Sequence, residues 1–219
     1  MKLLISLLLI IYHFQDNPDP HRFDSEIKKY KEMDQQNPVN PGGILFLGSS
    51  SIRMWKSLED DFKEFPVINR GFGGSHTSDV LYYFNELVLP YKPSLIIFYE
   101  GDNDLASGKS PEQVFSDFLQ LETMVEKFLP ETKIGFIAVK PSPSRWHLKD
   151  KHQTFNQKIK LYSLENENIS YIDIYTPMIN RDGRPDPELF IEDSLHMSHK
   201  GYDIWRKRVK TLLEMEFNK

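Results

Sequence analysis

Five short runs of apolar and β-branched residues recur along the chain, at residues 44–47, 67–69, 95–99, 134–139 and 169–174. Each run has the length of a β-strand and is apolar almost throughout. Strands that are buried on both faces show this pattern, whereas strands with one face in water alternate between apolar and polar residues. The pattern therefore predicts a parallel sheet that is covered on both sides.

Longer segments between and around these runs carry apolar residues at helical spacing. They predict helices over residues 24–36, 78–89, 111–128 and 200–217. Strands that alternate with helices predict an α/β protein, a three-layer, doubly wound α/β/α domain with a parallel sheet of about five strands. Ligands bind such sheets at the carboxyl ends of the strands, so chemistry is expected in the residues that follow each strand.

The N-terminus predicts export to the periplasm or the medium. Lys2 precedes an apolar run over residues 3–12. This run has the length of a signal-peptide core and is far shorter than the ~20 residues that span a bilayer, so no stable membrane span is expected. No small residues mark a cleavage site after it. An uncleaved membrane anchor and an N-terminal helix packed on the domain are the alternatives.

The predicted organisation has three parts. Residues 1–15 form the leader, residues 16–40 a linker with a short helix, and residues 41–219 the folded domain. The linker starts with a stretch over residues 16–22 that is rich in Pro, Asp and Asn. A chain of 219 residues can bury one substantial core and is too short for two large domains.

The composition of the chain limits which classes of partner it can bind. The net charge is −5, and the Lys and Arg residues are scattered, which argues against a nucleic acid as partner. The chain has no cysteine, which excludes disulfides, thiolate nucleophiles and cysteine zinc sites. A small molecule is the expected partner, and the sequence predicts no oligomeric state.

The first strand leads into Gly48 and three serines, Ser49, Ser50 and Ser51. The spacing of Gly43 and Gly48 imitates a phosphate-binding P-loop, but the required Lys is absent and the residues between the two glycines are those of a strand. The nucleophile elbow of α/β hydrolases is also excluded, because it needs a second Gly two residues after the Ser. The serines are left as candidate nucleophiles or as helix caps.

Two further strand ends carry polar groups. Gly71, Gly73 and Gly74 follow the second strand, where glycine lets backbone N–H groups approach a ligand, although the spacing is not that of a dinucleotide site. Asp102, Asn103 and Asp104 follow the third strand. An Asn side chain there can donate to a developing oxyanion, which makes Asn103 the candidate. Two acids so close in a turn are more typical of capping than of glycoside hydrolysis.

A carboxylate and an imidazole precede the last helix. Asp193 lies three residues before His196, and this spacing lets the carboxylate orient a general base. His199 follows three residues later, but no further ligand cluster accompanies the two histidines, so no metal site is predicted. Ser198 and His199 are expected to start the final helix.

Together the four segments resemble the SGNH hydrolases, the GDSL-like lipases and acylhydrolases named after their Ser, Gly, Asn and His. Ser50, Gly74, Asn103 and the pair Asp193 and His196 occur in the family's order, from about residue 44 to the last helix. The resemblance implies a flavodoxin-like fold without a cofactor. It also implies that Ser50 attacks the acyl carbon, that His196 takes its proton and that Asp193 orients His196. The implied oxyanion hole consists of the backbone N–H groups of Ser50 and Gly74 and the Asn103 side chain.

The first segment departs from the family in one position. The family commonly has Gly-Asp-Ser, whereas this chain has Gly48-Ser49-Ser50, so an acidic residue beside the nucleophile is missing. Alignment on Gly48 selects Ser50 as the nucleophile and leaves Ser49 and Ser51 as rivals.

The predicted function is hydrolysis of a small ester through an acyl-enzyme intermediate, with an acetylated carbohydrate or a lipid as substrate. Two alternatives are transfer of the acyl group to an alcohol by the same triad and a carbohydrate-binding relative that has lost turnover. Five side chains are candidates to line the cleft: Arg53, Trp55, Arg70, Arg145 and Trp146.

Overall fold

A single parallel sheet organises the computed structural model, which describes residues 17–217. Its strands are β1 (Ile44–Gly48), β2 (Val67–Gly71), β3 (Leu95–Tyr99), β4 (Lys133–Ile137) and β5 (Ile169–Ile172). The strand order is β2-β1-β3-β4-β5, and every neighbouring pair is parallel. This confirms the predicted α/β fold with five strands. The predicted leader, residues 1–15, lies outside the described residues.

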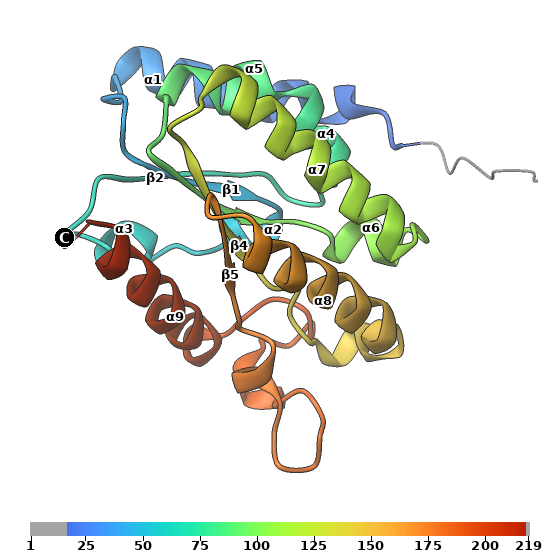
Figure 1. The fold of residues 1–219 in the computed structure, drawn as a ribbon. Helices are drawn as coiled ribbons and strands as arrows, with labels where there is room; N and C mark the ends of the chain where they lie inside the picture. Colours follow the sequence, from blue (N-terminus) through green and yellow to red (C-terminus); the bar gives the residue numbers. More distant parts are fainter. Residues whose placement is uncertain (1–16, 218–219) are drawn as a thin grey trace, which may run out of the picture.

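Helices cover both faces of the sheet (Figure 1). One face is covered by α1 (Asp24–Gln36), α4 (Thr77–Tyr82), α5 (Phe84–Leu87), α7 (Pro111–Phe128) and α8 (Lys149–Glu165). The other face is covered by α2 (Ser50–Arg53), α3 (Leu58–Asp61) and α9 (His199–Phe217). The short α6 (Asp102–Ala106) follows the end of β3. In the part of the chain that the structure describes, no helix is long and apolar enough to cross a membrane.

The strands supply both cores. In β1, Leu45 and Leu47 belong to one apolar cluster, and Ile44 and Phe46 belong to the cluster on the opposite face. All four side chains are fully buried. Successive residues of a strand point to opposite faces, so a strand between two helical layers must be apolar at every position.

The helix predicted over residues 78–89 is broken in the structure. It divides into α4 and α5, and Tyr83 between them leaves the helical conformation with φ −94° and ψ 17°. The hydroxyl of Tyr83 donates to the carboxylate of Asp24, 2.5 Å away. The break therefore coincides with a tertiary contact, which local periodicity does not encode.

The apolar periodicity of the sequence does not predict helix α8. Its buried positions are His152, Phe155, Asn156 and Ile159, so polar residues alternate with apolar ones on the inner face. The Asn156 amide can be buried at little cost because both of its ends are hydrogen-bonded. It accepts from the N–H of Val139 at 2.8 Å and donates to the Val139 carbonyl at 2.9 Å. These bonds satisfy the backbone where the chain leaves β4.

The N-terminal segment is packed on the domain. Phe23 and Ile27 are buried in the core, and the Phe23 ring meets that of Phe72 edge-on, with 5.0 Å between the ring centroids. Arg22, placed by the sequence in a linker, forms an ion pair with the buried Asp79. Part of the segment before residue 41 therefore contributes to the core of the domain.

Replacement of Ile27 tests how much this segment contributes to stability. Ile27 is 3% exposed, so Ile27→Ala removes buried apolar atoms and is expected to lower the free energy of unfolding by about 3 kcal/mol. Urea unfolding measures this loss. Met33 on the same helix is 52% exposed, and Met33→Ala should cost less than about 1 kcal/mol. Equal, small losses for both variants would show that the helix is not part of the cooperative unit.

Candidate active site

Three candidate residues follow three neighbouring strands. Strand β1 lies between β2 and β3, and Gly48 at its end is paired with Gly71 on one side and Tyr99 on the other. Ser50, Gly74 and Asn103 lie two, three and four residues beyond these paired ends. Parallel pairing therefore brings the three segments to the same edge of the sheet.

The turn before Ser50 depends on a close backbone approach. Gly48 has φ 142°, and a Cβ at this position would lie 2.0 Å from the carbonyl oxygen of Tyr99. The N–H of Ser49 donates to the same oxygen at 3.1 Å. Only glycine fits here, and the tight turn places Ser50 at the first position of α2, where the backbone N–H groups have no partner within the helix.

Ser50, His196 and Asp193 form a continuous hydrogen-bonded chain. Oγ of Ser50 lies 2.8 Å from Nε2 of His196, and Nδ1 of His196 lies 2.5 Å from Oδ2 of Asp193. A carboxylate only accepts hydrogen bonds, so Nδ1 carries the ring hydrogen of the neutral imidazole. Nε2 is then the acceptor that faces the Ser50 hydroxyl, which is the arrangement a general base needs.

Hydrogen bonds within the turn fix the positions of Asp193 and His196. Oδ1 of Asp193 accepts from the N–H groups of Leu195 and His196, each at 2.9 Å, and the N–H of Ile191 donates to the His196 carbonyl at 2.9 Å. Burial raises the pKa of Asp193, but the hydrogen bonds from His196 and Leu195 outweigh it and lower the pKa to about 2. Asp193 is therefore a carboxylate at neutral pH.

The neighbouring serines are placed differently from Ser50. Both Ser49 and Ser51 are buried, and Oγ of Ser51 has no hydrogen-bond partner among residues 17–217. Of the three hydroxyls, that of Ser50 is the one bonded to His196. The geometry favours Ser50 over its two rivals.

Gly74 and Asn103, two of the three predicted oxyanion donors, lie in the segments that follow β2 and β3. Gly74 has φ 83°, in the region that favours glycine, and its N–H has no partner within the described part of the chain. Nδ2 of Asn103 donates to the carbonyl of Ser75 at 3.0 Å, which ties α6 to the loop that contains Gly74. The second hydrogen of this amide nitrogen is left for a ligand.

Behind Asn103 lies a buried charged network that the sequence did not reveal. Oδ2 of Asp102 accepts from Nζ of Lys140 at 2.6 Å and from the hydroxyl of Tyr99 at 3.2 Å. Nη1 of Arg145 lies 2.7 Å from Oδ1 of Asp102. Burial raises the pKa of Asp102, but the cations of Lys140 and Arg145 outweigh it and hold the pKa below its ordinary value. Asp102 is thus an ion-pair partner rather than the predicted turn residue.

Glu100, directly after β3, is a buried acid whose pKa shifts in the opposite direction to that of Asp102. Burial raises its pKa well above the ordinary value, and the nearby carboxylate of Asp104 adds to the effect. Oγ of Ser75 bonds both to the Phe72 carbonyl, at 2.8 Å, and to Oε1 of Glu100. Ser75 has one hydroxyl hydrogen, which serves the carbonyl, so a neutral Glu100 donates to Ser75. This bond anchors the loop that contains Gly74.

The five residues expected to line the cleft do not all lie at the site. Trp55 and Arg70 are buried. Nε1 of Trp55 donates to Asp61 at 2.7 Å, and Nε of Arg70 donates to the hydroxyl of Tyr91 at 2.6 Å. Arg145 does reach the site, where Nη2 donates to Oδ1 of Asn103 at 2.9 Å.

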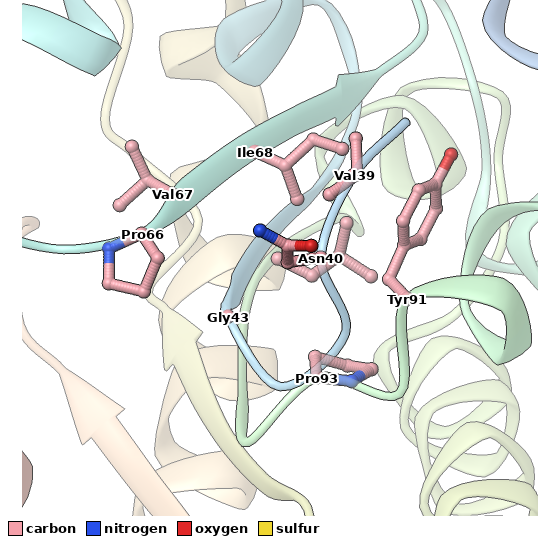
Figure 2. Close-up of a pocket in the computed structure, with 9 residues that line it drawn as sticks. Val39, Asn40, Gly43, Pro66, Val67, Ile68, Tyr91 and Pro93 are labelled. Carbon is pink, nitrogen blue, oxygen red and sulfur yellow. The ribbon is translucent and has the colours of Figure 1, made fainter. Parts of the chain in front are cut away.

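A cavity of about 170 Å³ lies at the other edge of the sheet (Figure 2). Its walls include Gly43, Pro66 and Pro93, which precede β1, β2 and β3. The cavity is therefore at the amino ends of the strands and plays no part in the arrangement around Ser50.

The histidine at the start of α9 is separate from the triad. Nδ1 of His199 lies 3.5 Å from the Asp203 carboxylate, and the His199 side chain is largely exposed. Within residues 17–217, no three His, Asp or Glu side chains gather as a metal site requires.

Comparison with known proteins gives one family match and several similar structures. The model of the GDSL-like lipase/acylhydrolase family matches residues 47–204. No curated protein sequence matches the chain. A GDSL-like lipase from Bacteroides thetaiotaomicron has a similar structure, with a TM-score of 0.76 and 24% identity over 88% of this chain and 99% of that one.

Two further solved structures share the fold. A lipase/acylhydrolase from Enterococcus faecalis has a TM-score of 0.63 and 21% identity, over 80% of this chain and 96% of its own. A catalytic mutant of an acetylxylan esterase from Geobacillus stearothermophilus has a TM-score of 0.62 and 14% identity, over 78% of this chain and 94% of its own. At these identities the structural similarity shows the fold.

The protonation of Glu100 predicts a pH-dependent effect on stability. An acid whose pKa is raised by folding stabilises the fold below its unfolded pKa, and this contribution is lost as the pH rises toward the folded pKa. Glu100→Gln keeps a hydrogen-bond donor for Ser75 but cannot ionise, so it removes this pH-dependent loss of stability. The free energy of unfolding of Glu100→Gln relative to the native chain should therefore increase as the pH rises above the ordinary carboxyl pKa, by at most about 1.4 kcal/mol per pH unit.

Urea unfolding at pH 5, 6 and 7 measures this difference. Glu126 is exposed, so Glu126→Gln is the control and should give a difference that does not change with pH. A flat difference for Glu100→Gln as well would mean that Glu100 is ionised in the folded protein.

Proposed function

The chain belongs to the GDSL-like lipase/acylhydrolase family, and we propose on this premise that it hydrolyses small acyl esters through an acyl-enzyme intermediate on Ser50. The observation that carries the proposal is the hydrogen-bonded chain from Asp193 through His196 to Ser50. Ser50 and His196 are 146 residues apart in the sequence, whereas Asp193 and His196 are only three residues apart. The fold brings them within bonding distance.

The proposed reaction begins with proton transfer. Nε2 of His196 takes the proton of Ser50 as Oγ attacks the acyl carbon, and Asp193 stabilises the imidazolium that forms. Collapse of the tetrahedral intermediate breaks the ester bond, and the leaving alcohol takes the proton from His196. Water then attacks the acyl-enzyme with His196 again as the base, which releases the acid and restores Ser50.

Charge that develops on the acyl oxygen is stabilised by nearby donors. The N–H groups of Ser50 and Gly74 and the amide of Asn103 come from the three segments that follow β1, β2 and β3. Such donors stabilise the transition state more than the ground state because they are aimed at the oxyanion. Removal of one donor typically costs about 100-fold or more in turnover.

An acetylated carbohydrate is the proposed substrate. One similar structure is that of an acetylxylan esterase, which supports an acetyl ester on a sugar. The predicted leader supports a substrate outside the cytoplasm, since export would bring the enzyme to the cell envelope or the medium.

Labelling with a serine-directed organophosphonate tests the proposed nucleophile. The native chain should take up one phosphonyl group, and Ser50→Ala should take up none, because the attacking hydroxyl is gone. Intact-protein mass spectrometry measures the uptake. Ser49→Ala is the matched control and should still be labelled. A label on Ser50→Ala would identify another nucleophile, and an unlabelled native chain would favour a binding protein.

A further inference from the structure

The guanidinium of Arg145 forks between two neighbouring residues of α6. Nη1 lies 2.7 Å from Oδ1 of Asp102, and Nη2 donates to Oδ1 of Asn103 at 2.9 Å. The Arg145 side chain is 18% exposed, so it lies between the buried network and the open site. One planar group thus links a buried carboxylate to the predicted oxyanion donor.

The oxygen and the NH₂ group of the Asn103 amide have nearly the same shape, but the oxygen accepts hydrogen bonds and the NH₂ group donates them. The orientation of the amide therefore matters. Rotation by 180° exchanges the oxygen and the nitrogen, and an oxygen presented to the substrate would repel the developing oxyanion. A guanidinium only donates hydrogen bonds, so Arg145 requires the oxygen on its side. The carbonyl of Ser75 only accepts, so it requires the nitrogen on the other side. Both neighbours select the productive orientation.

Arg145 is itself held in place from two directions. Asp102 is fully buried and bonded to Lys140, so the carboxylate cannot turn away without leaving a buried charge unpaired. The loop between Lys140 and Arg145 contains two prolines, and the N–H of Ser144 donates to the carbonyl of Ser194 at 3.1 Å. This bond connects the loop to the turn that carries the proposed general base.

We propose that Arg145 is a positioning residue, which acts through Asn103 by locking its amide with the N–H groups toward the oxyanion site. The proposal rests on the proposed ester hydrolysis for its effect on turnover, whereas the orientation of the amide stands on the contacts alone. The lock is supported by Asp102, and Lys140 holds Asp102 in turn.

A double-mutant cycle with p-nitrophenyl acetate as the probe separates this role from substrate binding. Arg145→Met should lower kcat by about 10- to 100-fold and change KM by less than about twofold, because the lost interaction acts in the transition state. Asn103→Ala should lower kcat by about 100-fold. Adding Arg145→Met to Asn103→Ala should then lower kcat by less than about threefold, since Arg145 has no amide left to orient.

Two further variants control for charge and packing. Arg145→Lys keeps a cation beside Asp102 and cannot bond both residues, so it should unfold near the temperature of the native chain while kcat stays at least about tenfold lower. Arg184 lies near the same loop, with its guanidinium carbon 5.8 Å from the centroid of the Trp146 ring. Arg184→Met makes the same chemical change without touching Asn103 and should keep the native kcat.

NMR provides a readout that does not depend on turnover. The side-chain NH₂ signal of Asn103, assigned by its loss in Asn103→Ala, should exchange with water faster in Arg145→Met than in the native chain or in Arg184→Met. Additive losses of kcat in the double mutant, a loss confined to KM, full activity of Arg145→Lys or unchanged exchange would each overturn the positioning role. Absence of Ser50-dependent turnover would instead end the proposed function and leave the exchange test in force.

Discussion

The pairing of β1 with β2 on one side and β3 on the other is the constraint on which the site depends. Gly48 is in register with Gly71 and with Tyr99, so the loops that follow the three strands must emerge together. Glycine at residue 48 accommodates the close approach of the Tyr99 carbonyl that this pairing requires. A nucleophile and its oxyanion donors can then come from segments that are distant in sequence.

Two buried acids near this edge are kept in opposite protonation states by their surroundings. Asp102 faces Lys140 and Arg145, and their charges outweigh the cost of burial. Glu100 faces other carboxylates and the hydroxyl of Ser75, so burial prevails and the acid is neutral. Glu100 supports the loop that contains Gly74 through its hydrogen bond with Ser75. Asp102 supports Asn103 through its ion pair with Arg145.

The sequence predicted the parts of the structure that local patterns encode. Strand β3 and helices α1 and α7 have the predicted bounds, because their apolar spacing is regular and unbroken. The polar inner face of α8 and the break at Tyr83 depend on partners far along the chain, so no periodicity reports them. In the site, four short motifs identified the candidate triad and oxyanion donors, whereas the contact of Arg145 with Asn103 arises only in the folded chain.

For the proposed reaction, a single acyl carbonyl group must reach Oγ of Ser50 and all three oxyanion donors at the same time. A crystal structure of the protein after reaction with a methylphosphonate ester tests this directly. We expect phosphorus bonded to Oγ of Ser50, with the phosphonyl oxygen about 2.7–3.1 Å from the N–H nitrogens of Ser50 and Gly74 and from Nδ2 of Asn103. A phosphonyl oxygen that points into solvent, away from these donors, would contradict it.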